Sequence, residues 1–191
     1  EIMPSLVGSE MCIRDSGGKP AKIEKIILDR SAPRGRTGSL PGTPRRMTVD
    51  KRLERILPRV QKPARYVGGE YNAVMKDKGS MDLRFAFCFP DTYEIGMSNL
   101  GLRILYGLLN EIPGVWCERA FAPWGDMEAE MRAAGLPLYA LESGDPVGEF
   151  DIVGFSVGYE MAYPAMLNML DLAGIPLRAC LLYTSDAADE L

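Results

Sequence analysis

From Leu83 onward, apolar runs alternate with segments of helical periodicity, and this alternation limits the possible folds more than any other feature. The runs at residues 83–89 and 150–156 predict buried strands. Weaker strands are predicted over 115–121, over 136–141 and from 175, with helices over 48–60, 98–110, 124–134 and 159–173. Strands separated by such helices join through right-handed crossovers. The expected fold is α/β: a doubly wound, mostly parallel sheet, flavodoxin-like or Rossmann-like, with about four to five strands.

The two ends of the chain predict something other than folded structure. Residues 10–16 and 180–185 can be back-translated into DNA strings of which one contains the reverse complement of the other, as in transposon-derived sequencing adapters. We therefore interpret residues 1–16 and 180–191 as adapter-derived and exclude them from fold reasoning. Residues 17–46 are rich in Pro, Gly and Arg and are interpreted as disordered or upstream read-through, with a nucleic-acid tail as the alternative. The genuine domain is expected over residues 47–179, as part of a longer parent chain.

Charge and hydropathy exclude several classes of partner. Residues 47–179 contain thirteen basic and eighteen acidic residues, a net charge of −5, which argues against a nucleic-acid phosphate partner. No run of about eighteen apolar residues predicts a membrane span, and no secretory signal pattern is present. A cytoplasmic location with no membrane partner is expected.

The inventory of histidine and cysteine limits the chemistry. The chain contains no histidine, which excludes a Ser-His triad even though residues 154–158 fit the letters of a GxSxG nucleophile elbow. The four cysteines form no CxxC pair, so no zinc site or disulfide framework is predicted. Cys88 and Cys117 fall inside predicted strands and are expected to be buried hydrophobic residues. No catalytic or metal-binding residue is assigned.

The candidate ligand site follows from the position of two loops. Ligands of doubly wound sheets bind beyond the carboxyl ends of the strands, where residues 90–98 and 156–160 follow the two strongest predicted strands. The residues assigned to this site are Asp91, Thr92, Glu94, Gly96, Ser98, Ser156, Gly158 and Glu160. Gly96 is expected to permit close backbone approach. The alternatives are that Asp91 and Ser98 cap turns or helices, and that Glu94 and Glu160 form a catalytic pair or are simply solvated.

Several motifs in one order resemble a family of radical SAM proteins with a cobalamin-binding-like N-terminal domain. They include RYVGGEYN at residues 65–72 and FPDTYEIGMSNLG at residues 89–101. The others lie at residues 118–124, 141–144, 151–156, 159–160 and 167–177, so that the resemblance spans residues 47–179. It implies a parent enzyme with an iron–sulfur cluster (4Fe-4S), S-adenosylmethionine and a downstream radical SAM barrel as the partner of this domain.

Two departures from this family define the expected function. The cluster needs three thiolates at CxxxCxxC spacing, which this chain lacks, so the triplet would lie downstream and the fragment alone is expected to be inactive. The cobalamin signature DxHxxG supplies a histidine to cobalt, and this chain has none. Cobalamin can still lie on the sheet edge without a protein ligand. The alternatives are a flavodoxin-like module for a nucleotide or flavin, and a docking platform without ligand.

Overall fold

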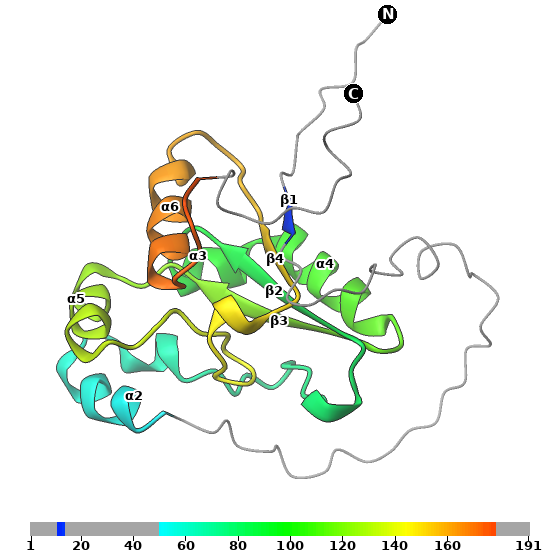
Figure 1. Cartoon of the computed structure of the whole chain (residues 1–191), viewed down its shortest axis with the longest axis horizontal. Helices are drawn as coiled ribbons and strands as arrows, with labels where there is room; N and C mark the ends of the chain where they lie inside the picture. Colours follow the sequence, from blue (N-terminus) through cyan, green and yellow to red (C-terminus); the bar gives the residue numbers. More distant parts are fainter. Residues whose placement is uncertain (1–10, 14–49, 179–191) are drawn as a thin grey trace, which may run out of the picture.

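The computed structural model describes residues 11–13 and 50–178, and it is an α/β layer with a central sheet (Figure 1). Three parallel strands form the core of this sheet: β2 (Leu83–Phe89), β3 (Val115–Phe121) and β4 (Ile152–Phe155). Their spatial order is β4-β2-β3, with β2 in the centre. This arrangement confirms the predicted doubly wound, flavodoxin-like or Rossmann-like fold.

Helices cover both faces of the sheet, as apolar strands buried on both sides require. On one face lie α3 (Tyr93–Ser98) and α4 (Leu100–Glu111), while α5 (Gly125–Ala134) and α6 (Ala162–Leu172) lie on the opposite side (Figure 1). Every residue of β3 is buried, although its sequence predicted the weaker strand. The sequence signal was weak because the strand contains charged side chains, and these can be buried because they pair with other charged groups in the folded protein.

The segment before the sheet forms short helices. These are α2 (Lys51–Ile56) and the 3-10 turns η1 (Leu57–Arg59), η2 (Pro63–Tyr66) and η3 (Lys78–Ser80). A further 3-10 turn, η4 (Val147–Glu149), lies between α5 and β4. The predicted helix over 48–60 is therefore shorter and narrows to a 3-10 turn at Pro58, as expected for an internal proline. Its cap is Asp50, whose carboxylate accepts a hydrogen bond from the Arg52 N–H at 2.7 Å. Thr48, the first residue of the predicted helix, lies outside the described residues.

Two predicted helices begin later than expected. The predicted helix over 98–110 is divided: Ser98 ends α3, and Asn99 caps α4 by accepting from the Leu102 N–H at 2.9 Å. The predicted helix over 159–173 begins only at Ala162, after a turn in which the Tyr159 carbonyl accepts from the Ala162 N–H.

Two predicted strands are absent from the described part of the chain. Residues 136–141 make only one isolated bridge, between Tyr139 and Pro146, because their backbone closes a local turn in which the Gly144 N–H donates to the Ala140 carbonyl. The segment from Ile175 closes the end of α6 instead, since the Ile175 N–H donates to the Leu170 carbonyl at 2.9 Å. No strand follows it up to residue 178.

A fourth strand comes from a segment that the sequence analysis excluded from the fold. Residues Met11–Ile13 form β1, which pairs antiparallel with the outer edge of β4. The physical reason is that an edge strand offers unpaired N–H and C=O groups to any extended segment, whatever its side chains. Helices long and apolar enough to cross a membrane are absent from residues 11–13 and 50–178.

Candidate functional site

The strand order creates a switch point at the carboxyl edge of the sheet. The chain leaves β2 toward β3 on one side, and after β3 it crosses to β4 on the other side of β2. In doubly wound sheets, ligands bind in the crevice where the connections diverge in this way. Here that point lies between the ends of β2 and β4, where residues 90–98 and 156–160 emerge. The eight predicted site residues therefore all follow the ends of β2 and β4, and three of them, Glu94, Gly96 and Ser98, lie within α3.

Direct bonds join these two loops. The Tyr159 hydroxyl donates to the Asp91 carboxylate, with 3.3 Å between the oxygens. One residue beyond β4, the Ser156 N–H donates to the Cys88 carbonyl at 3.1 Å. The negative charge of Asp91 raises the pKa of Tyr159, so this hydroxyl remains a hydrogen-bond donor at neutral pH. Tyr159 was not among the predicted site residues, although its position directly after the β4 loop could have suggested it.

Several predicted site residues have local structural partners. The Asp91 carboxylate also accepts from the Thr92 N–H at 2.7 Å, and Thr92 precedes α3 without making a side-chain cap. The Ser98 hydroxyl donates to the Ile95 carbonyl at 2.8 Å, in the last turn of α3. Asp91 therefore orders a turn through one carboxylate oxygen, as the capping alternative predicted, and reaches the second loop through the other.

The two glutamates of the loops differ in their surroundings. Glu94 accepts hydrogen bonds from Arg65 at 2.8 Å and from Lys62 at 3.4 Å. The hydrogen bond from Arg65 lowers the pKa of Glu94, which favours the anion and makes this side chain a poor proton donor. Glu160 is exposed, and its backbone carbonyl accepts from the Tyr163 N–H at 3.2 Å.

The two glycines of the site serve different purposes. Gly96 is buried, and a side chain there would collide with the rings of Phe121 and Phe89. Its lack of a side chain therefore permits close approach of the core, rather than leaving space at the surface. Gly158 is exposed, and an added Cβ would meet nothing within 4 Å. Gly158 consequently marks open space on the loop after β4.

Large apolar side chains surround these loops. Tyr159 is 54% exposed and Met161 is 82% exposed, and both follow β4 directly. Trp124, which follows β3, is 53% exposed, and the Arg65 guanidinium lies 5.8 Å from the centre of its ring. Exposed aromatic and thioether groups beside the carboxyl ends of strands can contact the flat face of a planar ligand. No sequence pattern predicted this apolar rim.

A small cavity lies beside the loop that follows β2. It has a volume of about 20 Å³ and its lining includes Arg65, Thr92, Trp124 and Tyr139. A space of this size holds about one water molecule. Of the predicted site residues, Thr92 alone lines it. The cavity is therefore too small for a cofactor.

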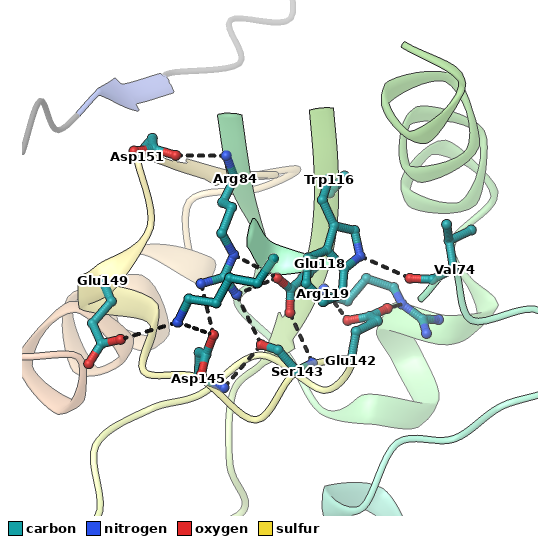
Figure 2. Close-up of polar contacts among 12 residues, drawn as sticks. Val74, Arg84, Trp116, Glu118, Arg119, Glu142, Ser143, Asp145, Glu149 and Asp151 are labelled. Atoms are coloured by element: carbon teal, nitrogen blue, oxygen red, sulfur yellow. Dashed lines mark hydrogen bonds and ion pairs between the residues drawn. The ribbon is translucent and has the colours of Figure 1, made fainter. Parts of the chain in front are cut away.

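A buried network of charges crosses β2 and β3 (Figure 2). Arg84 of β2 forms ion pairs with Glu118 of β3 and with Asp145 at 2.8 Å, and the Glu118 side chain is 0% exposed. The second carboxylate oxygen of Glu118 accepts from the Ser143 N–H at 2.9 Å. The Arg84 guanidinium also lies 4.2 Å from the centre of the Phe150 ring. These contacts attach the 143–145 turn to the sheet.

The other half of this network is centred on Arg119. Its guanidinium bonds to Glu142 at 2.6 Å and to Glu70 at 3.0 Å, and the Glu142 side chain is 0% exposed. Burial raises the pKa values of Glu118 and Glu142, while their arginine partners favour the charged forms. All buried side-chain polar atoms in the described part of the chain have partners. The network is therefore a structural one. No sequence pattern predicted it, although Glu118, Arg119 and Glu142 lie within the family motifs.

The residues present do not fit an iron–sulfur cluster. Cys88 and Cys117 are both 0% exposed, and burial raises the pKa of each thiol, which disfavours the thiolate that a cluster requires. Within residues 11–13 and 50–178, no group of three or more Cys, His, Asp or Glu side chains is arranged to hold a metal ion. A corrinoid held through an imidazole is also incompatible with this chain, because the sequence contains no histidine.

Comparison with known proteins identifies one family. Residues 101–181, from the first turn of α4 onward, match the model described as radical SAM proteins, N-terminal. No curated protein and no solved structure matches this chain. The match covers less than half of the 191 residues. It supports similarity to an N-terminal region of a radical SAM protein, in agreement with the resemblance drawn from the motifs.

Proposed function

We propose that this chain is the non-catalytic N-terminal domain of a radical SAM protein, and that its switch-point loops bind a planar corrinoid without a protein ligand to cobalt. The observation that carries the proposal is the hydrogen bond between Tyr159 and Asp91, which joins the loops after β4 and β2 at the position where doubly wound sheets bind ligands. The family match supports the placement in a radical SAM parent.

We expect the site residues to have different roles in binding the corrinoid. Tyr159 and Met161 would contact the face of the ring, and the open space at Gly158 would admit its edge. A bound corrinoid would supply group-transfer or radical chemistry at cobalt, whereas this domain would orient it and exclude water from one face. The iron–sulfur cluster and S-adenosylmethionine would belong to the catalytic barrel of the parent.

The test is a titration of the chain with hydroxocobalamin, followed through the corrin absorption bands and through co-elution on gel filtration. The Gly158→Leu variant should lose binding, because its side chain would occupy the open space of the loop without meeting other atoms. The control is Gly107→Leu, on the exposed surface of α4, where an added Cβ also meets nothing within 4 Å. Binding that is equal in both variants would contradict the assigned site.

Two further outcomes decide between the alternatives. Binding of a flavin or a nucleotide instead of hydroxocobalamin would favour the flavodoxin-like module. Unchanged spectra with all of these ligands would favour a docking platform without a ligand. The radical SAM assignment has its own test in the parent gene, whose reading frame should encode a CxxxCxxC triplet beyond this domain. A frame without the triplet would overturn that assignment.

A further inference from the structure

Helix α4 presents apolar side chains to the outside of the molecule along its whole length. Leu100 is 67% exposed, Ile104 is 52% exposed and Leu108 is 54% exposed, and Leu105 beside them is 48% exposed. Residues four apart lie on one side of a helix, so the first three form a continuous row that Leu105 widens. We call these four residues the outer stripe. Helix α4 itself lies on the side of the sheet away from α5 and α6 (Figure 1).

The inner side of α4 is apolar as well. Leu102 and Tyr106 are buried, and Asn110 is directed to β3 by its bonds to the Cys117 backbone. The only charged residues of the helix are Arg103 and Glu111. A helix in an ordinary surface position has a polar outer side, whereas a helix that is apolar nearly all round is buried in the complete protein. The outer stripe is therefore expected to be covered.

The size of the stripe selects the kind of partner. Four half-exposed side chains make a patch on the order of a few hundred Å², which is the size of a functional patch on a monomer. A stable dimer needs roughly 800 Å² from each partner, so a second copy on this stripe alone would be held too weakly. A domain of the same polypeptide is present at an effective concentration in the millimolar range, and interfaces of about 600–1,500 Å² are normal between such domains.

The position of the stripe connects it with the switch point. Leu100 is the first residue of α4 and directly follows residues 90–99, which leave the end of β2, so the stripe begins at the carboxyl edge of the sheet, where Tyr159 and Met161 are also exposed. A domain that faces the switch point would therefore also reach α4. The matching family is described as the N-terminal part of its proteins, and the match begins at residue 101, within α4.

From these observations we infer that the outer stripe of α4 is the docking surface for the radical SAM domain of the same polypeptide. This inference rests on the proposed function for the existence of that domain. It adds the surface through which the two domains meet. The apolar character of the stripe implies a permanent interface rather than a transient one.

The inference is tested by the accessibility of single cysteines to a maleimide reagent. The background carries Cys12→Ser and Cys180→Ser, and Cys88 and Cys117 are buried in the fold. The Leu108→Cys variant reports on the stripe, and Glu111→Cys, on the same helix, is the matched control. Each variant is labelled in this chain and in the parent protein that carries the radical SAM domain.

In this chain, both introduced thiols should react rapidly at every protein concentration. In the parent, labelling of Leu108→Cys should slow at least tenfold, while labelling of Glu111→Cys should be nearly unchanged. Equal rates for Leu108→Cys in the two proteins would overturn the inference. Protection of this variant in the isolated chain that increases with protein concentration would also overturn it, because a second copy would then cover the stripe.

The two proposals fail in different measurements. If the ligand assignment is wrong, the Leu108→Cys variant will not bind hydroxocobalamin in the titration. Its substitution lies outside the switch-point loops and so would not itself cause this result. Failure of the docking surface would appear only in the labelling rates. An Ile104→Cys variant repeats the labelling measurement at a second position of the stripe and provides the answer if Leu108→Cys folds poorly.

Discussion

The side-chain amide of Asn110 bonds to both backbone groups of Cys117. Its oxygen accepts from the Cys117 N–H at 3.0 Å, and its nitrogen donates to the Cys117 carbonyl at 2.9 Å. The amide thereby imitates a neighbouring strand at the outer edge of β3. Further along this edge, Leu141 donates its N–H to the Arg119 carbonyl, and the Glu142 carboxylate accepts from the Arg119 N–H. The edge is thus closed to pairing with other chains.

Replacing Asn110 by Ala should lower the free energy of unfolding by about 1–3 kcal/mol, because two backbone groups of a buried residue would lose their partners. Urea unfolding followed by circular dichroism measures this change. The control is Asn110→Asp, which keeps an acceptor for the Cys117 N–H but loses the donor for its carbonyl. Its free energy of unfolding should also fall below that of the wild type, because a carboxylate oxygen would then face the Cys117 carbonyl. Equal stability of all three proteins would show that the amide does not close the edge.

Replacing Glu142 by Gln should lower the free energy of unfolding by about 3–5 kcal/mol, because Arg119 would be left buried with less than its full charge compensation. The surface control is Arg132→Ala, which breaks exposed ion pairs with Glu128 at 2.9 Å and with Asp171 at 2.7 Å. That change should cost less than about 1 kcal/mol. Chemical unfolding compares the two variants, and similar losses for both would contradict the structural importance of the buried network.

The two buried thiols should be unreactive in the folded protein. Burial raises the pKa values of Cys88 and Cys117, so neither forms a thiolate at mildly alkaline pH. In the Cys12→Ser, Cys180→Ser background, Ellman's reagent should detect no thiol in native buffer and both thiols in guanidinium. Rapid reaction of either thiol under native conditions would contradict the burial and reopen a redox or metal-binding role.

The pKa of Glu94 should depend on Arg65. The Arg65 side chain bonds to the carboxylate of Glu94 and lowers its pKa below the ordinary value. A carboxyl group with a lowered pKa in the folded state adds stability above its unfolded pKa, and this contribution is lost as the pH falls through the folded pKa. The Arg65→Met variant should therefore raise the pKa of Glu94 and reduce the loss of stability in acid.

Carbon-13 NMR titration of the glutamate carboxyl groups measures this pKa directly. The control is Arg59→Met, which removes an ion pair with Glu130 and should leave the titration of Glu94 unchanged. An unchanged midpoint for Glu94 in Arg65→Met would show that the ion pair does not persist in solution.

The local hydrophobic pattern was sufficient to predict the elements in which the apolar residues of the sequence are also the buried ones. The apolar run that forms β2 and the periodic segment of α5 were both predicted, because their side chains report their burial directly. The same pattern was wrong for residues 136–141, which were predicted to be a strand but make only one isolated bridge, between Tyr139 and Pro146. It also missed α3, a helix of six residues that is too short for a periodic signal.

For the candidate site, the sequence located the loops but not the relations between their residues. Strand ends and loop composition pointed to residues 91–98 and 156–160, and the strand order now brings both to one switch point. Tyr159 was not predicted as a member, because its role depends on its distance to Asp91 across 68 positions of the chain. Gly96 was expected to serve a ligand, whereas its surroundings are the rings of Phe121 and Phe89.

The sequence by itself determined the alternation of strands and helices, the absence of histidine and the lack of a cysteine triplet, because these are properties of residue type and spacing. Only the tertiary structure decided that β2 is the central strand and that Arg84, Glu118, Arg119 and Glu142 compensate one another inside the protein. It also decided that α4 keeps an apolar outer side. The physical reason is that burial and charge pairing depend on contacts between residues far apart in the chain, which no local pattern contains.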